Sequence, residues 1–371
     1  MSETVILIGV SDSDHSRSLQ LKRYLKSNAT DFLEVGWGRN SGVGINLLTR
    51  KSSFLKALPS LVVDVFRFNL YLLLARNART VILAHPCQLN LAVVYPLAFL
   101  LRKYVVVDFY TSLHDTLVMD RGLVREKSGL SWILKVVDRL TLRLANAIIF
   151  DSRSNQERFM RNSGYEFKKS TVLYPSPPAS FQISPRVSSG EKRDVIFVGK
   201  FSPLQGLEHI LTAATLPKLS EVSFTIVGSG QRPELVREYW DKQNIKFIAW
   251  VDYQKLAAEI RNHSISLGVF GESEKAGSVF PNKVMESLRS GVPCITRDGE
   301  ISENFSDIGC EFVTAGDPDQ IANKILDLVS NPDKLRELSN QAAAFSTGIG
   351  SDAEQCRKFA KVLPDMIFNC R

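Results

Sequence analysis

The segment SVFPNKVMESLRSGVP, residues 278–293, carries the side chains best suited to chemistry. Apolar residues recur at helical spacing after Pro281, which predicts a short helix. Asn282, Lys283 and Glu286 lie in its first turns and can reach one region above the helix start. A lysine is unfavourable at this end of the helix dipole unless an anion lies there too. The pattern predicts a site for a phosphorylated and hydroxylated ligand, with a surface Lys and Glu pair as the alternative.

Two further turns join a predicted strand to a predicted helix. VGKFSPLQGLEHIL places Gly199 and Lys200 after one strand, and IVGSGQRPEL places Gly228 and Gly230 after the next. Backbone amides in such a turn, with a lysine beside them, can hold a diphosphate, and plain connecting turns are the alternative. The second turn lacks the third glycine of the dinucleotide fingerprint, so the sequence does not favour a dehydrogenase.

Polar side chains also follow predicted strands in the first half of the chain. His15 and Arg17 come after the first apolar run, where they could meet an acceptor or a phosphate. A helix-capping serine beside a solvated arginine would explain the same residues. Asp108, Tyr110 and His114 follow the run VVVDF. Asp108 could position an acceptor hydroxyl and His114 could pass a proton, whereas a surface or capping histidine is the alternative.

The elements that position these residues follow from an alternation of short apolar runs with longer helical patterns. The runs typical of buried parallel strands are residues 4–10, 32–38, 80–85, 105–109 and 147–151 and, after a Pro- and Ser-rich stretch, 194–199, 223–228, 245–250, 265–270 and 293–297. Helices are predicted near 317–345 and 352–367. This rhythm indicates an α/β protein with two doubly wound parallel sheets. Such sheets bind ligands beyond the carboxyl ends of their strands, so we expect an active-site cleft there.

Residues 194–297 resemble the nucleotide-sugar-binding domain of the retaining GT-B glycosyltransferases of glycosyltransferase family 4, the glycosyl transferases group 1. The most specific piece is the block P-N-K-x-x-E-x-x-x-x-G-x-P, which begins at Pro281. Upstream, VVVDFYTSLHDTLVMDR resembles the loop that precedes the acceptor site in some members. The resemblance implies a GT-B fold, in which two Rossmann-like domains face a cleft.

The implied domains divide the chain into four parts. We expect an acceptor-binding domain over residues 1–175, a linker over 176–193 and a nucleotide-sugar-binding domain over 194–350. A final helix within residues 351–371 is expected to pack back on the first domain.

The resemblance also implies roles for single residues. Glu286 would bind the ribose hydroxyls of the donor, and Lys200 would approach its diphosphate. The segment around Trp250 and Val251 would contact the base. The other donor-binding candidates are Gly199, Gln205, Gly228, Gly230, Lys275, Ser278, Asn282 and Lys283. Asp108, His114 and Lys200 are the catalytic candidates, and the acceptor-binding candidates are His15, Arg17 and Tyr110.

The first departure from the family pattern concerns the transferred sugar. Many members carry two glutamates eight positions apart, whereas Ser278 stands eight positions before Glu286. The usual contact to the sugar is therefore missing or is supplied by Glu274.

The second departure concerns the diphosphate. The pattern G-R-x-x-x-x-K-G appears here with Lys200 and Gln205, so one positive charge is lost. Lysine does not make the planar two-point contact that arginine makes to phosphate, so donor affinity would fall unless Lys275 or Lys283 compensates.

Composition excludes several classes of protein. The 371 residues are 44% hydrophobic and 23% charged, which indicates two globular domains rather than disorder. Five cysteines without metal-ligand spacing favour a reducing compartment, and we expect no metal and no cofactor beyond the donor substrate. No basic stretch precedes the first apolar run, so we expect no signal peptide and a cytoplasmic protein. Residues 80–101 carry no formal charge, but Pro86 divides them into a strand and a helix rather than a membrane span.

Charge is concentrated in the first half of the chain. Residues 1–170 carry 24 lysines and arginines against 14 aspartates and glutamates, a net charge of +10, while the whole chain carries +7. Beside apolar helical patterns such as LVVDVFRFNLYLLLAR, residues 61–76, this surplus suits an anionic membrane surface or a phosphate-bearing lipid. A solvated basic face is the alternative, and no nucleic-acid-binding motif accompanies the charge.

These observations together predict a retaining, metal-independent glycosyltransferase. It would move a sugar from a nucleotide-diphosphate donor to a hydroxyl of a glycan or lipid-linked acceptor in cell-surface polysaccharide biosynthesis, with possible peripheral contact to the inner face of the membrane. A nucleotide-sugar epimerase and a noncatalytic partner subunit of the same fold are the alternatives. Ser278 and Gln205 are the residues that favour the noncatalytic subunit.

Overall fold

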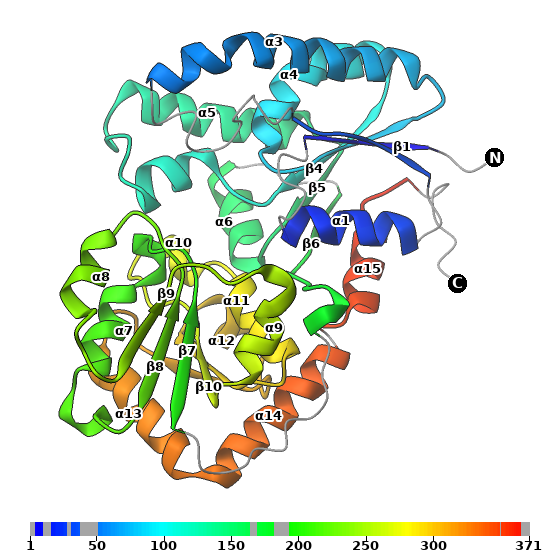
Figure 1. Cartoon of the computed structure of the whole chain (residues 1–371). Coiled ribbons are helices and arrows are strands. Elements are labelled where there is room, and N and C mark those ends of the chain that lie inside the picture. Colours follow the sequence, from blue (N-terminus) through cyan, green and yellow to red (C-terminus); the bar gives the residue numbers. More distant parts are fainter. Residues whose placement is uncertain are drawn as a thin grey trace. The chain divides into compact units, whose positions relative to one another are not determined.

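The computed structural model describes residues 4–9, 16–27, 31–37, 51–163, 169–181, 193–348 and 350–364. The chain divides into two compact units, one made of residues 1–173 and 355–371 and the other of residues 174–354. Each unit is built on a parallel sheet of six strands with helices against it (Figure 1). The predicted α/β class, with two doubly wound sheets, is confirmed.

The sheet of the first unit has the strand order β2-β1-β3-β4-β5-β6. Its strands are β1 (Val5–Ile8), β2 (Phe32–Val35), β3 (Thr80–Leu83), β4 (Tyr104–Phe109), β5 (Ala147–Phe150) and β6 (Ser170–Val172). The inner strands are continuous apolar runs, such as VILI in β1, because helices cover both faces of the sheet.

Two sets of helices cover this first sheet. One face packs against α3 (Lys51–Leu74), α4 (Cys87–Leu100), α5 (Gly129–Leu144) and α6 (Arg153–Ser163). The other face packs against α1 (Ser16–Ser27) and the end of α15 (Asp352–Ala360), where Tyr24 and Phe359 are fully buried. A π-helical turn, Asp115–Asp120, lies between β4 and α5.

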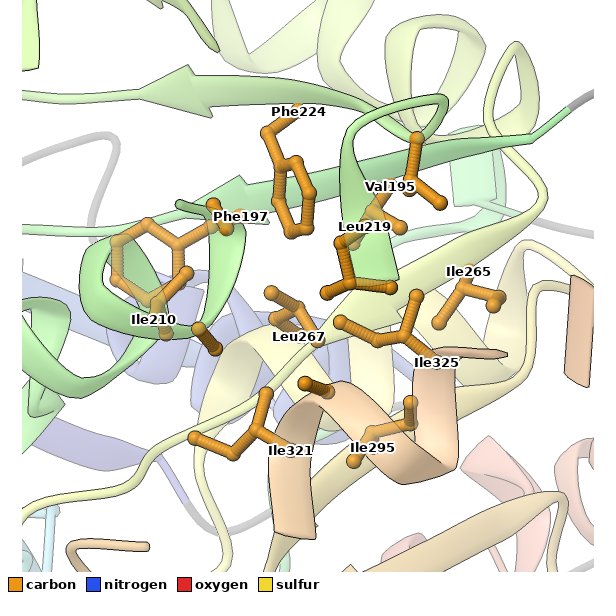
Figure 2. Packing of buried hydrophobic residues seen from close by; sticks show 14 of the residues in the cluster. Val195, Phe197, Ile210, Leu219, Phe224, Ile265, Leu267, Ile295, Ile321 and Ile325 are labelled. Atoms are coloured by element: carbon orange, nitrogen blue, oxygen red, sulfur yellow. The ribbon is translucent and has the colours of Figure 1, made fainter. Parts of the chain in front are cut away.

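The sheet of the second unit has the order β12-β11-β10-β7-β8-β9. Its strands are β7 (Asp194–Val198), β8 (Ser223–Val227), β9 (Ile245–Ile248), β10 (Ile265–Leu267), β11 (Cys294–Arg297) and β12 (Cys310–Val313). Figure 2 shows the core on one face, where α7 (Leu207–Ala214) and α13 (Pro318–Ser330) contribute Ile210 and Ile321 against Phe197 and Leu267.

The opposite face of this sheet carries the helices that matter for the site. Here α9 (Tyr253–Arg261) and α11 (Asn282–Arg289) contact each other, and α11 also contacts β10 and β11. The remaining helices of the unit are α8 (Pro233–Tyr239), α10 (Glu274–Gly277), α12 (Glu300–Asn304) and α14 (Pro332–Thr347).

Each predicted strand corresponds to an observed strand, but β6 and β12 were not predicted. Both are short edge strands that are only partly buried, so neither carries a clear apolar run. The helical range predicted near 317–345 forms two helices, α13 and α14, which meet at Asn331. Its side chain caps α14 by accepting a hydrogen bond from the amide of Lys334.

The membrane-span alternative for residues 80–101 is not realised. They form β3 and α4, and in the parts of the chain that the structure describes every helix falls short of the length and apolar character that crossing a membrane requires.

Candidate functional site

The second sheet has a switch in strand order between its central strands. From β7 the chain proceeds through β8 to β9, and it then returns to place β10 on the other side of β7. In open parallel sheets, ligands bind beyond the carboxyl ends of the strands at such a point. The loops that leave this edge contain Gly199 after β7, Gly228 after β8 and Gly268 after β10. The loop after β10 leads through α10 to α11.

Glycines allow the first two of these loops to pack backbone against backbone. Gly228 has φ of +139°, and a Cβ atom there would overlap the carbonyl oxygen of Gly199. Gly230 pairs with Phe201 in an isolated parallel bridge, and a Cβ at Gly230 would lie 2.6 Å from the Phe201 nitrogen. The turns predicted at these glycines therefore lie together at one edge of the sheet.

Helix α11 confirms the predicted short helix. Pro281 is its N-cap and provides no side-chain cap, so the cap residue itself places no acceptor at the positive end of the helix dipole. Gly291, at φ of +74°, follows the helix end. The side chains from Lys283 to Arg289 are all buried, which is unusual for a helix with this many polar residues.

Lys283 points from α11 toward the loop after β7. Its ammonium donates to Oε1 of Gln205, and Nζ lies 3.6 Å from the centroid of the Phe197 ring. A Cβ on Gly199 would lie 2.5 Å from Nζ, so a side chain there would displace this ammonium. Burial lowers the pKa of Lys283 well below its ordinary value, although the thiol of Cys294 and the carboxylate of Glu286 act in the opposite direction.

Glu286 lies one turn further along α11 and is also buried. The hydroxyl of Tyr253, at the start of α9, donates to its Oε1 at 3.1 Å. Burial raises the pKa of Glu286 to about 7, although the Tyr253 hydrogen bond and the charge of Lys283 act in the opposite direction. Tyr253 was not among the predicted site residues, yet an aromatic residue two positions after Val251 at a helix start was a usable signal.

The arrangement joins two complementary binding functions. Lys283, at the positive end of the α11 dipole, can neutralise and hydrogen-bond an anion beside Gly199. The carboxylate of Glu286 can accept two hydrogen bonds from a pair of neighbouring hydroxyls. Perturbed ionisable groups at the switch point of a parallel sheet are typical of a ligand site.

Other predicted donor-site residues lie on the segments that follow β7, β9 and β10. Lys200 is exposed and directly follows Gly199. Trp250 follows the edge strand β9 and is 79% exposed. Val251 is partly buried against the face of the sheet that α9 covers. Asn282 is the first residue of α11, and Lys275 lies in α10.

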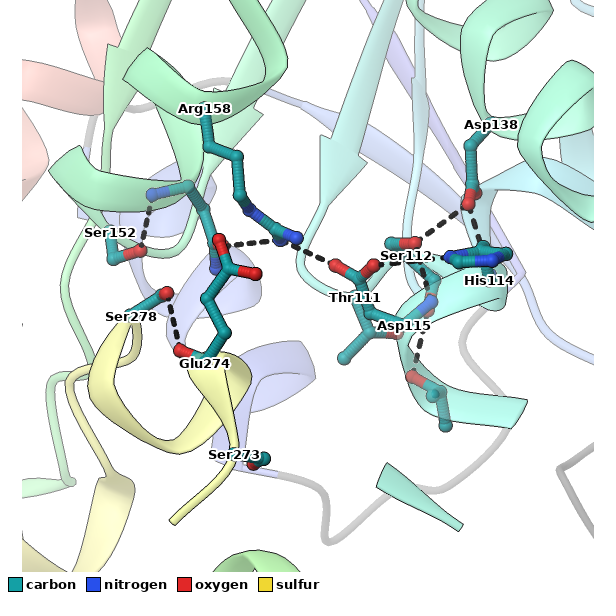
Figure 3. Close-up of polar contacts among 12 residues, drawn as sticks. Thr111, Ser112, His114, Asp115, Asp138, Ser152, Arg158, Ser273, Glu274 and Ser278 are labelled. Atoms are coloured by element: carbon teal, nitrogen blue, oxygen red, sulfur yellow. Dashed lines mark hydrogen bonds and ion pairs between the residues drawn. The ribbon is translucent and has the colours of Figure 1, made fainter. Parts of the chain in front are cut away.

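Ser278 makes hydrogen bonds within its own turn. It is the C-cap of α10, and its hydroxyl donates to the carbonyl oxygen of Glu274 at 2.7 Å, as Figure 3 shows. The Glu274 side chain is exposed. Glu274, rather than Ser278, therefore has the accessible carboxylate in this turn.

In the first unit, the alternative of a solvated Arg17 is wrong. Arg17 is buried, and its guanidinium donates to both carboxylate oxygens of Asp108, with Nη2 at 2.7 Å from Oδ1. It also donates to the carbonyl of Leu173 at 2.7 Å. Burial opposes the charge, but the pull of Asp108 outweighs it and raises the pKa of Arg17.

This ion pair also corrects the predicted role of Asp108. The side chain is fully buried, and Arg17 occupies both of its oxygens. The carboxylate therefore stabilises the start of α1 against β4 instead of reaching an acceptor hydroxyl. Tyr110, the ring of which lies under the Arg17 guanidinium at 5.4 Å, is partly exposed at the same sheet edge.

His114 belongs to a second buried network, organised by Asp138 (Figure 3). Asp138 accepts from the Ser112 hydroxyl at 2.7 Å and from the backbone amides of Leu113 and His114, both at 3.1 Å. Nε2 of His114 lies 3.1 Å from the Ser131 hydroxyl. Burial raises the pKa of Asp138 despite these hydrogen bonds. The alternative of a surface histidine is therefore wrong, and His114 is held in place from two sides.

Sequence reasoning missed two further side chains of the first unit. Arg158 from α6 binds the carboxylate of Asp115 next to His114. His85 is the second residue after β3. Its Nδ1 lies 3.1 Å from the Thr111 hydroxyl, and its ring packs edge-on against Tyr110. A histidine at the end of the predicted strand over residues 80–85 was a usable signal for His85. His15 lies outside the described residues.

Across the described ranges, no group of three or more His, Cys, Asp or Glu side chains gathers as metal ligands do.

Gly228→Ala is expected to lower the free energy of unfolding by about 1 to 3 kcal/mol, because a side chain at this positive φ is strained and displaces the Gly199 loop. Urea denaturation measures the change. Gly129→Ala is the matched control, since a Cβ there meets nothing within 4 Å. Equal loss in both variants would contradict the close packing of the two loops.

Comparison with known proteins places these features in context. Residues 192–331 match the family model described as Glycosyl transferases group 1. A protein of Klebsiella pneumoniae named "Uncharacterized 41.2 kDa protein in cps region" is 27% identical over 142 residues, which are 38% of this chain and 37% of that protein. The match thus spans little more than a third of the length of this curated relative.

Two solved structures are similar over nearly their whole length. Anabaena Alr3699/HepE in complex with UDP-glucose superposes with a TM-score of 0.69 at 16% identity, covering 96% of this chain and 98% of that one. Sucrose-phosphate synthase from Thermosynechococcus elongatus superposes with a TM-score of 0.73 at 14% identity, covering 96% and 97%. At these identities the likeness concerns the fold, and it confirms the expected GT-B architecture.

Proposed function

We propose that this protein is a glycosyltransferase that takes a sugar from a nucleoside-diphosphate donor and attaches it to an acceptor hydroxyl. The observation that carries the proposal is the buried pair on α11, Lys283 and Glu286, at the switch point of the second sheet. The match of residues 192–331 to the group 1 family model supports it. The UDP-glucose bound by the Anabaena protein supports the choice of a nucleoside-diphosphate sugar as the donor.

Each part of the donor has a partner in this unit. The ribose hydroxyls would donate to Glu286, and the diphosphate would lie beside Lys283, Lys200 and the first amides of α11. The base would contact the segment around Trp250 and Val251, while Glu274 would face the sugar. A diphosphate beside Lys283 would stabilise the charged ammonium, which burial disfavours in the free protein.

The reaction breaks the bond between the anomeric carbon and the diphosphate oxygen and forms a bond from that carbon to the acceptor oxygen. Negative charge grows on the departing diphosphate, and a diphosphate oxygen takes up the proton that the acceptor hydroxyl loses. Lys200 and Lys283 lower the barrier electrostatically by stabilising the leaving group in place. In this proposal the lysines supply the positive charge and no metal is needed, and the anomeric configuration is retained, as in the family that the sequence resembles.

The acceptor that we propose is a glycan or a lipid-linked intermediate of cell-surface polysaccharide biosynthesis, and the transferred group is a hexose. The support for the pathway is the name of the Klebsiella relative, which refers to a cps region. His114 and Tyr110 remain the candidates for contact with the acceptor in the first unit.

A panel of nucleotide sugars tests the proposal. Thermal shift identifies a donor, and release of the nucleoside diphosphate is then measured with and without membrane extract. Binding with acceptor-dependent release supports the transferase, whereas release of an epimerised sugar would indicate an epimerase. Failure to bind any donor would favour a noncatalytic subunit.

Lys283→Met is expected to weaken UDP binding about tenfold or more, because a charge-assisted hydrogen bond to phosphate is lost while the apolar stem is kept. Binding of uridine, which has no phosphate, should change little. Isothermal titration of both ligands measures the two effects. Equal weakening for uridine and UDP would mean that Lys283 does not contact the diphosphate.

A further inference from the structure

The outward face of α3 is apolar. Val63, Phe66, Leu70 and Leu74 are exposed and recur at the i, i+3, i+7 and i+11 spacing of one helix face, with Phe66 69% and Leu74 71% exposed. The opposite face carries Phe68 and Leu72, which are fully buried in the core. A helix on the surface of a water-soluble domain normally turns polar residues outward. Helix α3 has an apolar face on both sides.

The end of α4 extends this apolar surface. Phe99 and Leu100 are 71% and 76% exposed. Helices α3 and α4 lie side by side (Figure 1), and the Lys103 ammonium, just after α4, donates to the carbonyl of Ala75 at the end of α3 at 2.9 Å. The exposed apolar ends of the two helices are therefore neighbours.

Helix α5, which packs on the other side of α4, repeats the pattern with charge added. Ile133, Leu140 and Leu144 are exposed on one stripe of the helix. Exposed basic residues occupy the adjacent stripe at the same periodicity, next to the exposed Trp132: Lys135, Arg139 and Arg143. Such a face has apolar, aromatic and basic side chains in the arrangement typical of helices that lie in a bilayer interface.

Charge in this region is strongly one-sided. Residues 51–145 contain 13 lysines and arginines against 6 aspartates and glutamates, a surplus equal to the +7 of the whole chain. Four of the six acids are buried: Asp64, Asp108, Asp115 and Asp138. At the ends of α3 and α4 the exposed charges are basic: Arg76, Arg79 and Arg102.

We propose that the outer face of α3, the end of α4 and α5, hereafter the α3–α5 face, binds the surface of an anionic lipid bilayer. Apolar side chains would enter the boundary between headgroups and acyl chains while the basic residues meet lipid phosphates. A second copy of the chain fits less well, because a twofold contact would bring two basic surfaces together. The proposal does not depend on the glycosyltransferase assignment.

Sedimentation with vesicles tests the proposal on the full chain. The protein is expected to bind vesicles of equal parts phosphatidylglycerol and phosphatidylcholine, to bind phosphatidylcholine alone weakly, and to lose part of its binding at high salt. Phe66→Glu combined with Leu74→Glu should lower binding about tenfold or more, because it places charge in the apolar boundary. Reversing Lys135, Arg139 and Arg143 to glutamate should lower it about fivefold or more per residue and flatten the salt dependence.

Trp240→Glu is the matched control, since Trp240 is 72% exposed on α8's C-cap in the other unit and should leave vesicle binding unchanged. Thermal melting verifies that each variant is folded. The proposal is overturned if the protein ignores anionic vesicles, or if the Phe66 and Leu74 variant binds them like the unchanged protein. It is also overturned if the protein is a dimer without lipid that the same variant splits, because a second copy would then cover the face. Donor binding measured on the same samples keeps this outcome separate from that of the proposed function.

Discussion

Glu286→Ala is expected to reduce the affinity for a nucleoside-diphosphate sugar by a factor of about 100 or more while the protein stays folded. The carboxylate of Glu286 would accept two hydrogen bonds from the ribose, and a hydrogen bond to a charged group contributes about 1.5 to 3 kcal/mol. Unlike Lys283→Met, this substitution should weaken uridine and UDP alike, because both ligands carry the ribose. Isothermal titration measures the change.

The pH dependence of binding gives the same prediction a second readout. The pKa of Glu286 is raised to about 7 in the folded protein, so the side chain is largely protonated below that pH and offers fewer acceptors. Affinity for a nucleotide sugar should therefore rise as pH increases through 7, and Glu286→Gln should remove this rise.

Stability provides the check that the variants are folded. Because the folded-state pKa of about 7 exceeds the ordinary value of 4.5, the folded protein holds a proton that the unfolded chain releases between these pH values. The free energy of unfolding therefore carries the full Glu286 contribution below pH 4.5, and this contribution is lost as the pH rises through about 7. Glu286→Gln should be at least as stable as the unchanged protein above pH 7.

Glu238→Ala, an exposed change on α8, is the control and should leave affinity unchanged. A Glu286→Ala protein that binds the nucleotide with unaltered affinity would remove the ribose role.

Arg17→Met is expected to cost about 3 to 5 kcal/mol of unfolding free energy, the largest stability effect that we predict. The substitution leaves the carboxylate of Asp108 fully buried without its counterion, and the desolvation of a lone charge is then uncompensated. Urea denaturation followed by circular dichroism measures the loss.

A double variant separates the ion pair from its parts. Arg17→Met with Asp108→Leu removes both charges and should recover most of the lost stability, since replacing a buried pair by apolar residues is often neutral. Arg153→Met is the control, because Arg153 makes its ion pair with Glu157 at the surface. If Arg17→Met unfolds like the control, the buried carboxylate of Asp108 does not require Arg17 as its counterion.

Local patterns in the sequence were sufficient for the architecture. Continuous apolar runs such as VILI and VIFV predicted the inner strands, because a strand covered on both faces can expose no polar side chain. The edge strands β6 and β12 were not predicted, because a partly covered strand needs no continuous apolar run. The helix from Asn282 was predicted with its limits because its stop signal, Gly291, is local.

Side-chain partners were beyond these patterns. The sequence suggested that Lys275 or Lys283 could compensate for the positive charge lost at Gln205, but only the structure shows that the ammonium of Lys283, 78 residues later, meets the Gln205 side-chain oxygen. The sequence also proposed Arg17 as an acceptor-binding residue, with a solvated arginine as the alternative, whereas Asp108, 91 residues later, buries it in an ion pair. The periodicity of apolar residues shows which face of a helix or strand is buried, and it can be found from residues that are close together in the sequence. Which charges meet depends on the order of strands in each sheet, because that order brings distant loops to one edge, and only the tertiary structure decides it.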